Sequence, residues 1–189
     1  MIRAIIFDYF GVICSDEYWN IVKQDENIRS SFHSLANEVN LGKVHWSDFV
    51  HQVAAKTGRS EEEITQLYEN EKIHPELIAY IAQLHSKYKI ALLTNAHHEF
   101  LEPIIEKTRM KDVFDTVIMS SRVGLIKPDP RIFQKALDAL HVEPHEAVFI
   151  DDVARNVVGA EEVGINAIVY ESLDQLRGKL DKLGVNPDS

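Results

Sequence analysis

The chain has 189 residues, of which 45% are hydrophobic and 26% charged, and this is enough for one packed domain with a small subdomain. Twenty Lys and Arg residues against 30 Asp and Glu residues give a net charge of −10, which disfavours nucleic acids and anionic membranes as partners. No apolar run approaches the ~20 residues needed to span a bilayer. Cys14, the single cysteine, excludes an intrachain disulfide and a cysteine metal cluster. We therefore expect a soluble, cytoplasmic protein.

Short runs rich in β-forming residues alternate with helical patterns along most of the chain. The predicted strands cover residues 3–8, 89–94, 115–120, 147–151 and 166–170. Strands that alternate with helices of this length form right-handed crossover units and a parallel sheet. The sequence thus predicts an α/β fold, a three-layer doubly wound parallel sheet of Rossmann-like type.

The segment between the first two predicted strands has a different texture. Its apolar residues recur at helical spacing, which predicts four short helices over 17–25, 28–42, 47–58 and 60–71. Ser60 and Glu63 have the spacing of a capping box, and Gly58 is a plausible helix end. We expect a helical cap over residues 15–74, inserted into a core domain made of residues 1–14 and 75–189.

Polar residues lie where the predicted strands end. They are Asp8 after the first strand, Thr94 and Asn95 after the second, and Asp151 and Asp152 after the fourth, with Lys127 in the loop after the third. In an open parallel sheet, ligands bind outside the carboxyl ends of the strands. Close carboxylates are costly unless a cation lies between them, and Mg²⁺ prefers oxygen ligands. The pattern therefore indicates a Mg²⁺ site.

Each of these residues also has a simpler interpretation. A lone acid at a strand end is most often a turn or capping residue, and Asp152 is well placed to cap the following helix. Lys127 precedes Pro128 and could be a solvated loop residue. Individual caps do not explain why several strand ends carry complementary chemistry, so the combination favours a site.

The segments "IIFDYFGVI", "LLTN", "GLIKPDPRIF" and "VFIDDVARNVVGA" resemble the four motifs of the haloacid dehalogenase superfamily of hydrolases. The closest resemblance is to bacterial glucose-1-phosphate phosphatase and to the N-terminal phosphatase domain of epoxide hydrolases. The resemblance implies an aspartate nucleophile at Asp8 and phosphate binding by Thr94 and Lys127. It also implies Mg²⁺ ligands from Asp8, the backbone carbonyl of Phe10, Asp151 and Asp152. Asn95 is a further candidate for binding phosphate.

Phe10 departs from this resemblance, because phosphatases of the superfamily usually carry a second Asp two residues after the first. A phenyl ring cannot transfer a proton, and loss of a general acid–base group costs roughly 10²–10⁴-fold in rate. Three interpretations stay open. The first is a phosphatase, either with a stabilised leaving group such as a sugar anomeric oxygen or an acyl phosphate, or with another proton source such as Asp16 or Glu17. The others are a metal-independent 2-haloacid dehalogenase and a ligand-binding or regulatory protein.

The presence of both Asp151 and Asp152 favours the phosphatase interpretation, because two close acids without a metal are costly. We expect a Mg²⁺-dependent phosphatase that hydrolyses a small phosphorylated metabolite, such as a sugar phosphate, through an aspartyl-phosphate. His97 and His98 are interpreted as residues at a helix start rather than as metal ligands. The aromatic residues of the insert are interpreted as cap core rather than as a substrate platform; they are Tyr18, Trp19, Phe32, Trp46 and Phe49.

Overall fold

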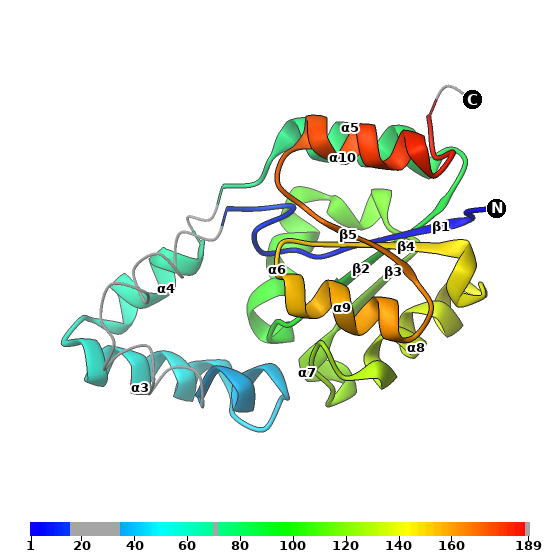
Figure 1. Ribbon diagram of the computed structural model, residues 1–189. Helices are drawn as coiled ribbons and strands as arrows, with labels where there is room; N and C mark the ends of the chain where they lie inside the picture. The colour runs from blue at the N-terminus through cyan, green and yellow to red at the C-terminus, as the bar shows by residue number, and fades with distance from the viewer. Residues whose placement is uncertain (16–34, 70–71, 188–189) are drawn as a thin grey trace.

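The computed structural model describes residues 1–15, 35–69 and 72–187. Its centre is a five-stranded parallel sheet in the order β3-β2-β1-β4-β5 (Figure 1). The strands are β1 (Ala4–Phe7), β2 (Lys89–Thr94), β3 (Thr116–Met119), β4 (Ala147–Asp151) and β5 (Asn166–Val169). All five predicted strands are therefore confirmed, to within one residue at either end.

Alternate residues of β1 face two separate hydrophobic layers. Ile5 and Phe7 belong to a cluster with helices α5 (Pro75–His85), α6 (His98–Thr108) and α10 (Leu173–Lys182). Ala4 and Ile6 belong to a second cluster with α8 (Pro130–Leu140) and α9 (Ala154–Glu162). Because β1 is buried on both faces, it reads as a continuous apolar run rather than an alternating one. The three-layer doubly wound α/β fold is confirmed.

Short helical turns complete the connections between these elements. They are α7 (Ser120–Val123) and the 3₁₀ turns η1 (Met110–Val113) and η2 (Pro144–Glu146). In the part of the chain that the structure describes, no helix is both long enough and apolar enough to cross a membrane.

The described part of the insert is helical and projects from one side of the sheet (Figure 1). It contains a helical segment over residues 35–40 and helices α3 (Trp46–Thr57) and α4 (Glu61–Glu69). Ser60 and Glu63 form the predicted capping box, since each backbone N–H donates to the other side chain, at 2.8 and 3.1 Å. The helix predicted over 17–25 lies outside the described residues. The division into core and cap at residues 15 and 74 stays a prediction.

Candidate active site

Three neighbouring strands bring polar side chains to one edge of the sheet. Asp8 follows β1 directly, Thr94 ends β2 and Asp151 ends β4, and β1 lies between the other two strands. The backbone N–H of Asp8 donates to the carbonyl of Ile150 at 2.9 Å, which continues the ladder to the end of the strand. The topology therefore places these three side chains together at the carboxyl edge, as the sequence predicts.

Lys127 joins this group from the loop that precedes α8. Its Nζ lies 2.7 Å from Asp8 Oδ1 and 2.7 Å from Asp151 Oδ2, and it donates to the carbonyl of Leu93 at 3.0 Å. The side chain is 1% exposed, so its interpretation as a solvated loop residue is wrong. A fully engaged ammonium between two carboxylates fixes the positions of both acids.

The electrostatics of this group are those of an acid-rich buried site. Burial, followed by repulsion from Asp151, raises the pKa of Asp8 well above its usual value despite the nearby lysine. Burial alone would lower the pKa of Lys127, but the attraction of Asp8 and Asp151 outweighs it and holds that pKa above its usual value. One lysine therefore does not neutralise the carboxylates that surround it.

Asp151 is held by the start of α9. Its Oδ1 accepts from the backbone N–H of Val153 at 2.8 Å, and Asn156 Nδ2 donates to both carboxylate oxygens, at 3.1 and 3.0 Å. Val153 is the N-cap of α9, so the prediction that Asp152 caps this helix is wrong. The structure leaves Asp152 directed at the turn that follows β1.

The three carboxylates are close enough to share one cation. Each of Asp8, Asp151 and Asp152 offers a carboxylate oxygen, and these three oxygens lie within 4.8 Å of one another. Gly11, in the left-handed conformation with φ +72°, makes room for the Asp152 carboxylate, since a Cβ at this position would collide with it. An oxygen-only donor set with excess negative charge fits a hard divalent cation such as Mg²⁺.

A crevice of about 150 Å³ opens beside these acids. Thr94 lies in it with a buried Oγ1 that has no hydrogen-bond partner among the described residues, so its hydroxyl is available to a ligand. The Asn95 amide instead bridges the loop of Lys127: it accepts from that residue's backbone N–H at 2.8 Å and donates to its carbonyl at 3.2 Å. Asn95 thus anchors the lysine while also lining the crevice.

Other polar residues of the crevice carry no sequence signal of their own. Asn37 and Asn40 reach it from the helical segment over residues 35–40, and Arg155 reaches it from the first turn of α9. Arg155 lies four residues after Asp151, but Asp151 ends β4 and α9 begins at Ala154, so only the structure shows that Arg155 reaches the crevice. Asp129, two residues after Lys127, points away: it caps α8 and forms an exposed 2.6 Å ion pair with Arg131, which lowers the pKa of Asp129 to about 2.

The Phe10 ring packs beside the crevice against aromatic neighbours. It stacks on Phe100 of α6 with ring centroids 6.3 Å apart, and it meets Tyr9 edge-on at 5.0 Å. His97 is the N-cap of α6, where its Nδ1 accepts from the backbone N–H of Glu99 at 3.3 Å, and α6 begins at His98. The helix-start interpretation of both histidines is confirmed. Asp16 and Glu17, the proposed proton sources, lie outside the described residues.

The arrangement matches a family of hydrolases. A family model described as haloacid dehalogenase-like hydrolase covers residues 2–164. The chain is 24% identical over 190 residues to (S)-2-haloacid dehalogenase 4A of Burkholderia cepacia, covering 88% of this chain and 82% of that protein. It is 25% identical over 181 residues to the pyrophosphatase PpaX of Bacillus cereus, covering 86% of this chain and 80% of that protein.

Solved structures share the fold. An enzyme of the same family from Bacteroides thetaiotaomicron, solved in complex with magnesium and inorganic phosphate, superposes with a TM-score of 0.76 at 20% identity, covering 93% of this chain and 99% of that one. Four other relatives are much longer than this chain, which spans only 10% to 13% of their length; one is bifunctional epoxide hydrolase 2 of Sus scrofa, 40% identical over 70 residues.

Proposed function

Because the chain belongs to the haloacid dehalogenase-like hydrolases, we propose that it is a Mg²⁺-dependent phosphatase that hydrolyses a small phosphate monoester through an aspartyl-phosphate on Asp8. The observation that carries the proposal is the convergence of the Asp8, Asp151 and Asp152 carboxylates around Lys127, the one lysine that contacts Asp8 and Asp151 among the described residues. We further propose that the protein acts in the cytoplasm on a phosphorylated metabolite.

Each residue of the site has a role in this proposal. Asp8 attacks phosphorus, and the P–O bond to the leaving group breaks as the new bond forms. Lys127 orients the Asp8 carboxylate and offsets charge on the phosphoryl oxygens, while the unpartnered Thr94 hydroxyl donates to one of them. Water then attacks phosphorus in the aspartyl-phosphate, which releases inorganic phosphate and restores Asp8.

The cation has a defined place in the proposal. Asp8, Asp151, Asp152 and the backbone carbonyl of Phe10 would hold Mg²⁺, which would supply charge stabilisation to the transferring phosphoryl group. The relative from Bacteroides thetaiotaomicron crystallised with magnesium and inorganic phosphate supports this assignment by its shared fold.

Mg²⁺ should stabilise the folded protein even without substrate. Binding to the native state alone adds about 2.7 kcal/mol at a free concentration 100 times Kd. We expect the midpoint of thermal unfolding to rise with Mg²⁺ concentration in the wild type and to change little in Asp152→Asn, whose donor set is weaker. Glu161→Gln, which neutralises an exposed acid further along α9, is the matched control and should keep the full shift. A wild-type midpoint that does not respond to Mg²⁺ would contradict the metal assignment.

Phe10 makes the rate sensitive to the leaving group. Since position 10 cannot protonate the departing oxygen, kcat/KM should fall steeply as leaving-group pKa rises across a series of aryl and alkyl phosphates. Phe10→Asp should flatten this dependence and raise kcat/KM for alkyl esters by up to about 10²-fold. The gain is reduced by whatever stability is lost when the ring no longer stacks on Phe100. Phe10→Leu removes the ring without adding an acid and should keep the steep dependence. A shallow dependence in the wild type would mean that another group already supplies the proton.

A second function is favoured by one observation. Phe10 would suit a 2-haloacid dehalogenase, because a halide leaves without a proton, and the similarity to the Burkholderia cepacia dehalogenase covers 88% of this chain. Against it, a metal-independent enzyme would keep Asp8, Asp151 and Asp152 together without a metal cation between them, which is costly because Asp8 and Asp151 are buried. We therefore place phosphate hydrolysis first.

A further inference from the structure

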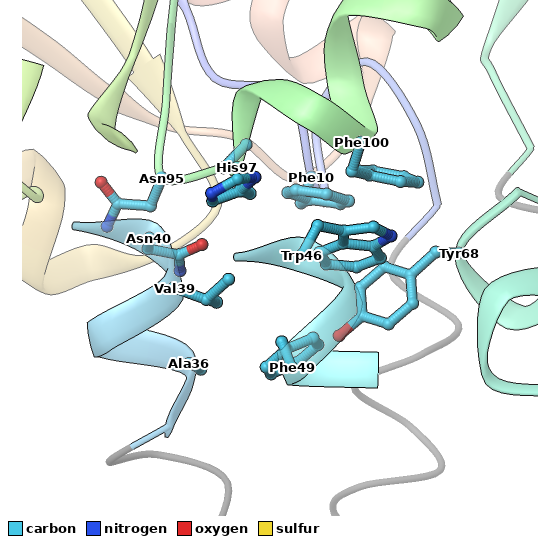
Figure 2. Close-up of a pocket in the computed structure, with 11 residues that line it drawn as sticks. Phe10, Ala36, Val39, Asn40, Trp46, Phe49, Tyr68, Asn95, His97 and Phe100 are labelled. Atoms are coloured by element: carbon cyan, nitrogen blue, oxygen red, sulfur yellow. The ribbon is translucent and has the colours of Figure 1, made fainter. Parts of the chain in front are cut away.

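A second cavity of about 70 Å³ adjoins the catalytic crevice at the boundary between cap and core. Figure 2 shows its walls, which consist mainly of large rings. Four residues, Phe10, Ala36, Asn40 and Asn95, line both this cavity and the crevice that holds Asp8. The second cavity therefore lies next to the space that a phosphoryl group at Asp8 would occupy.

The rings on either side of the cavity belong to different parts of the fold. Trp46 of the cap lies 5.0 Å from Phe100 of the core, 5.2 Å from Phe49 and 4.8 Å from Tyr68, measured between ring centroids. Phe10 stacks on the core side of the same group. We call these five residues the aromatic wall. Phe49 is buried in the core of the cap, as the sequence indicates, and Trp46 is half-buried against it; both also line the cavity. Tyr18, Trp19 and Phe32 lie outside the described residues.

A polar contact fixes the cap half of this wall against the core. The Glu99 carboxylate, on α6, accepts from the backbone N–H of Trp46 at 3.1 Å, and its other oxygen lies 3.2 Å from His45 Nδ1. The hydrogen bond from His45 and the one from Trp46 lower the pKa of Glu99, so the carboxylate is ionised at neutral pH. The position of Trp46 beside Phe100 is therefore held by more than ring packing.

Amide and imidazole groups line the crevice end of the cavity. Asn95 and Asn40 line both spaces, and His97, which is 3% exposed, lies between Asn95 and Phe10 in Figure 2. Its Nδ1 accepts from the backbone of Glu99, so the tautomer that makes this bond carries its proton on Nε2. The far end, formed by Trp46, Phe49 and Tyr68, consists mostly of ring atoms, with the Tyr68 hydroxyl and the Trp46 indole nitrogen as its polar groups.

We propose that the aromatic wall binds a short apolar segment of the leaving group of the phosphate ester; the wall acts on binding, while the leaving-group pKa sets the rate of the chemical step. The proposal rests on the proposed function and names its substrate class. An apolar cavity of about 150 Å³ holds benzene, and this one, at about 70 Å³, is about half that size.

Alkylphosphonates test the wall without requiring turnover. Each methylene that leaves water contributes about 0.8 kcal/mol, which is about fourfold in affinity. In calorimetric titrations of the wild type with Mg²⁺ present, butylphosphonate should bind at least tenfold more tightly than methylphosphonate. Trp46→Ala should reduce this ratio to below about threefold, and Val39→Phe, which fills the cavity from a position that lines it, should do the same. Val158→Ala, at an exposed position on α9, should keep the wild-type ratio.

The outcomes separate this proposal from the proposed function. Equal affinity of the wild type for methyl- and butylphosphonate overturns the apolar site, and a wild-type ratio retained in both Trp46→Ala and Val39→Phe overturns its location. Hydrolysis of butyl phosphate with Mg²⁺ is measured separately. If butylphosphonate binds more tightly than methylphosphonate but no phosphate is released, the phosphatase activity is contradicted and the apolar binding site is supported. If phosphate is released but the two phosphonates bind equally, the apolar site is contradicted and the phosphatase activity is supported.

Discussion

Asp8→Asn should abolish turnover while the protein stays folded. An amide cannot replace the attacking carboxylate, and loss of a nucleophile that works with its partners costs on the order of 10⁶-fold in other hydrolases. We expect a loss of at least about 10⁴-fold in kcat toward an aryl phosphate with Mg²⁺ present. The amide oxygen can still accept from the backbone N–H of Tyr9, which donates to Asp8 Oδ1 at 2.7 Å.

The stability of this variant separates a chemical role from a structural one. Asp8→Asn removes an ion pair with Lys127, but it also removes the cost of burying a charge and the repulsion from Asp151, so the thermal midpoint should change little. Lys127 keeps its contacts with Asp151 and the Leu93 carbonyl. Asp129→Asn, the same change at a helix cap outside the site, should retain full activity. If Asp8→Asn keeps substantial hydrolysis, Asp8 is not the nucleophile.

Lys127→Met should impair folding as well as catalysis. Removing one partner of a buried ion pair leaves uncompensated charge and costs about 3–5 kcal/mol. Here Asp8 and Asp151 would face each other without the ammonium that lies 2.7 Å from each. Chemical denaturation in EDTA, which removes any stabilising cation, should show the full decrease in the free energy of unfolding. Adding Asp8→Asn to Lys127→Met should recover part of it, because one of the two repelling charges is gone.

The free energy of unfolding of Lys127→Met should increase as the pH falls below 7. The pKa of Asp8 is raised in the folded wild type, and without the lysine it should be raised further. The folded state then binds more protons than the unfolded state, so stability should rise as pH falls from 7 toward the ordinary pKa of an aspartate, near 3.9. Lys89→Met is the control, since Lys89 Nζ donates to the carbonyl of Leu140. An unchanged stability in Lys127→Met would contradict the ion-pair account.

The sheet and its acids could be predicted from the sequence for one physical reason. In a doubly wound fold every parallel strand delivers its last residue to the same edge, so strand ends alone bring Asp8, Thr94 and Asp151 together. The burial of Lys127 is less local, because Asp129 in the same loop points to solvent and only the tertiary fold distinguishes the two.

The second cavity could not be predicted in the same way. Its walls join Phe10 and Phe100 of the core to Trp46 and Tyr68 of the cap, which are far apart in the chain. Apolar periodicity shows which residues of a helix are buried but not which element they meet. Asn37 and Asn40 are likewise brought to the crevice only by the position of the cap beside the core. Sequence patterns therefore indicate the chemistry at Asp8 better than they indicate the substrate.

One pair of assays on the same purified protein tests the central claim most directly. Inorganic phosphate release from butyl phosphate and phenyl phosphate is measured with Mg²⁺ and with EDTA, beside chloride release from 2-chloropropionate under both conditions. We expect phosphate release that requires Mg²⁺ and no chloride release, because the three carboxylates at the sheet edge form a cation site beside the nucleophile. Chloride release that persists in EDTA, without phosphate release, would contradict the account and identify a dehalogenase.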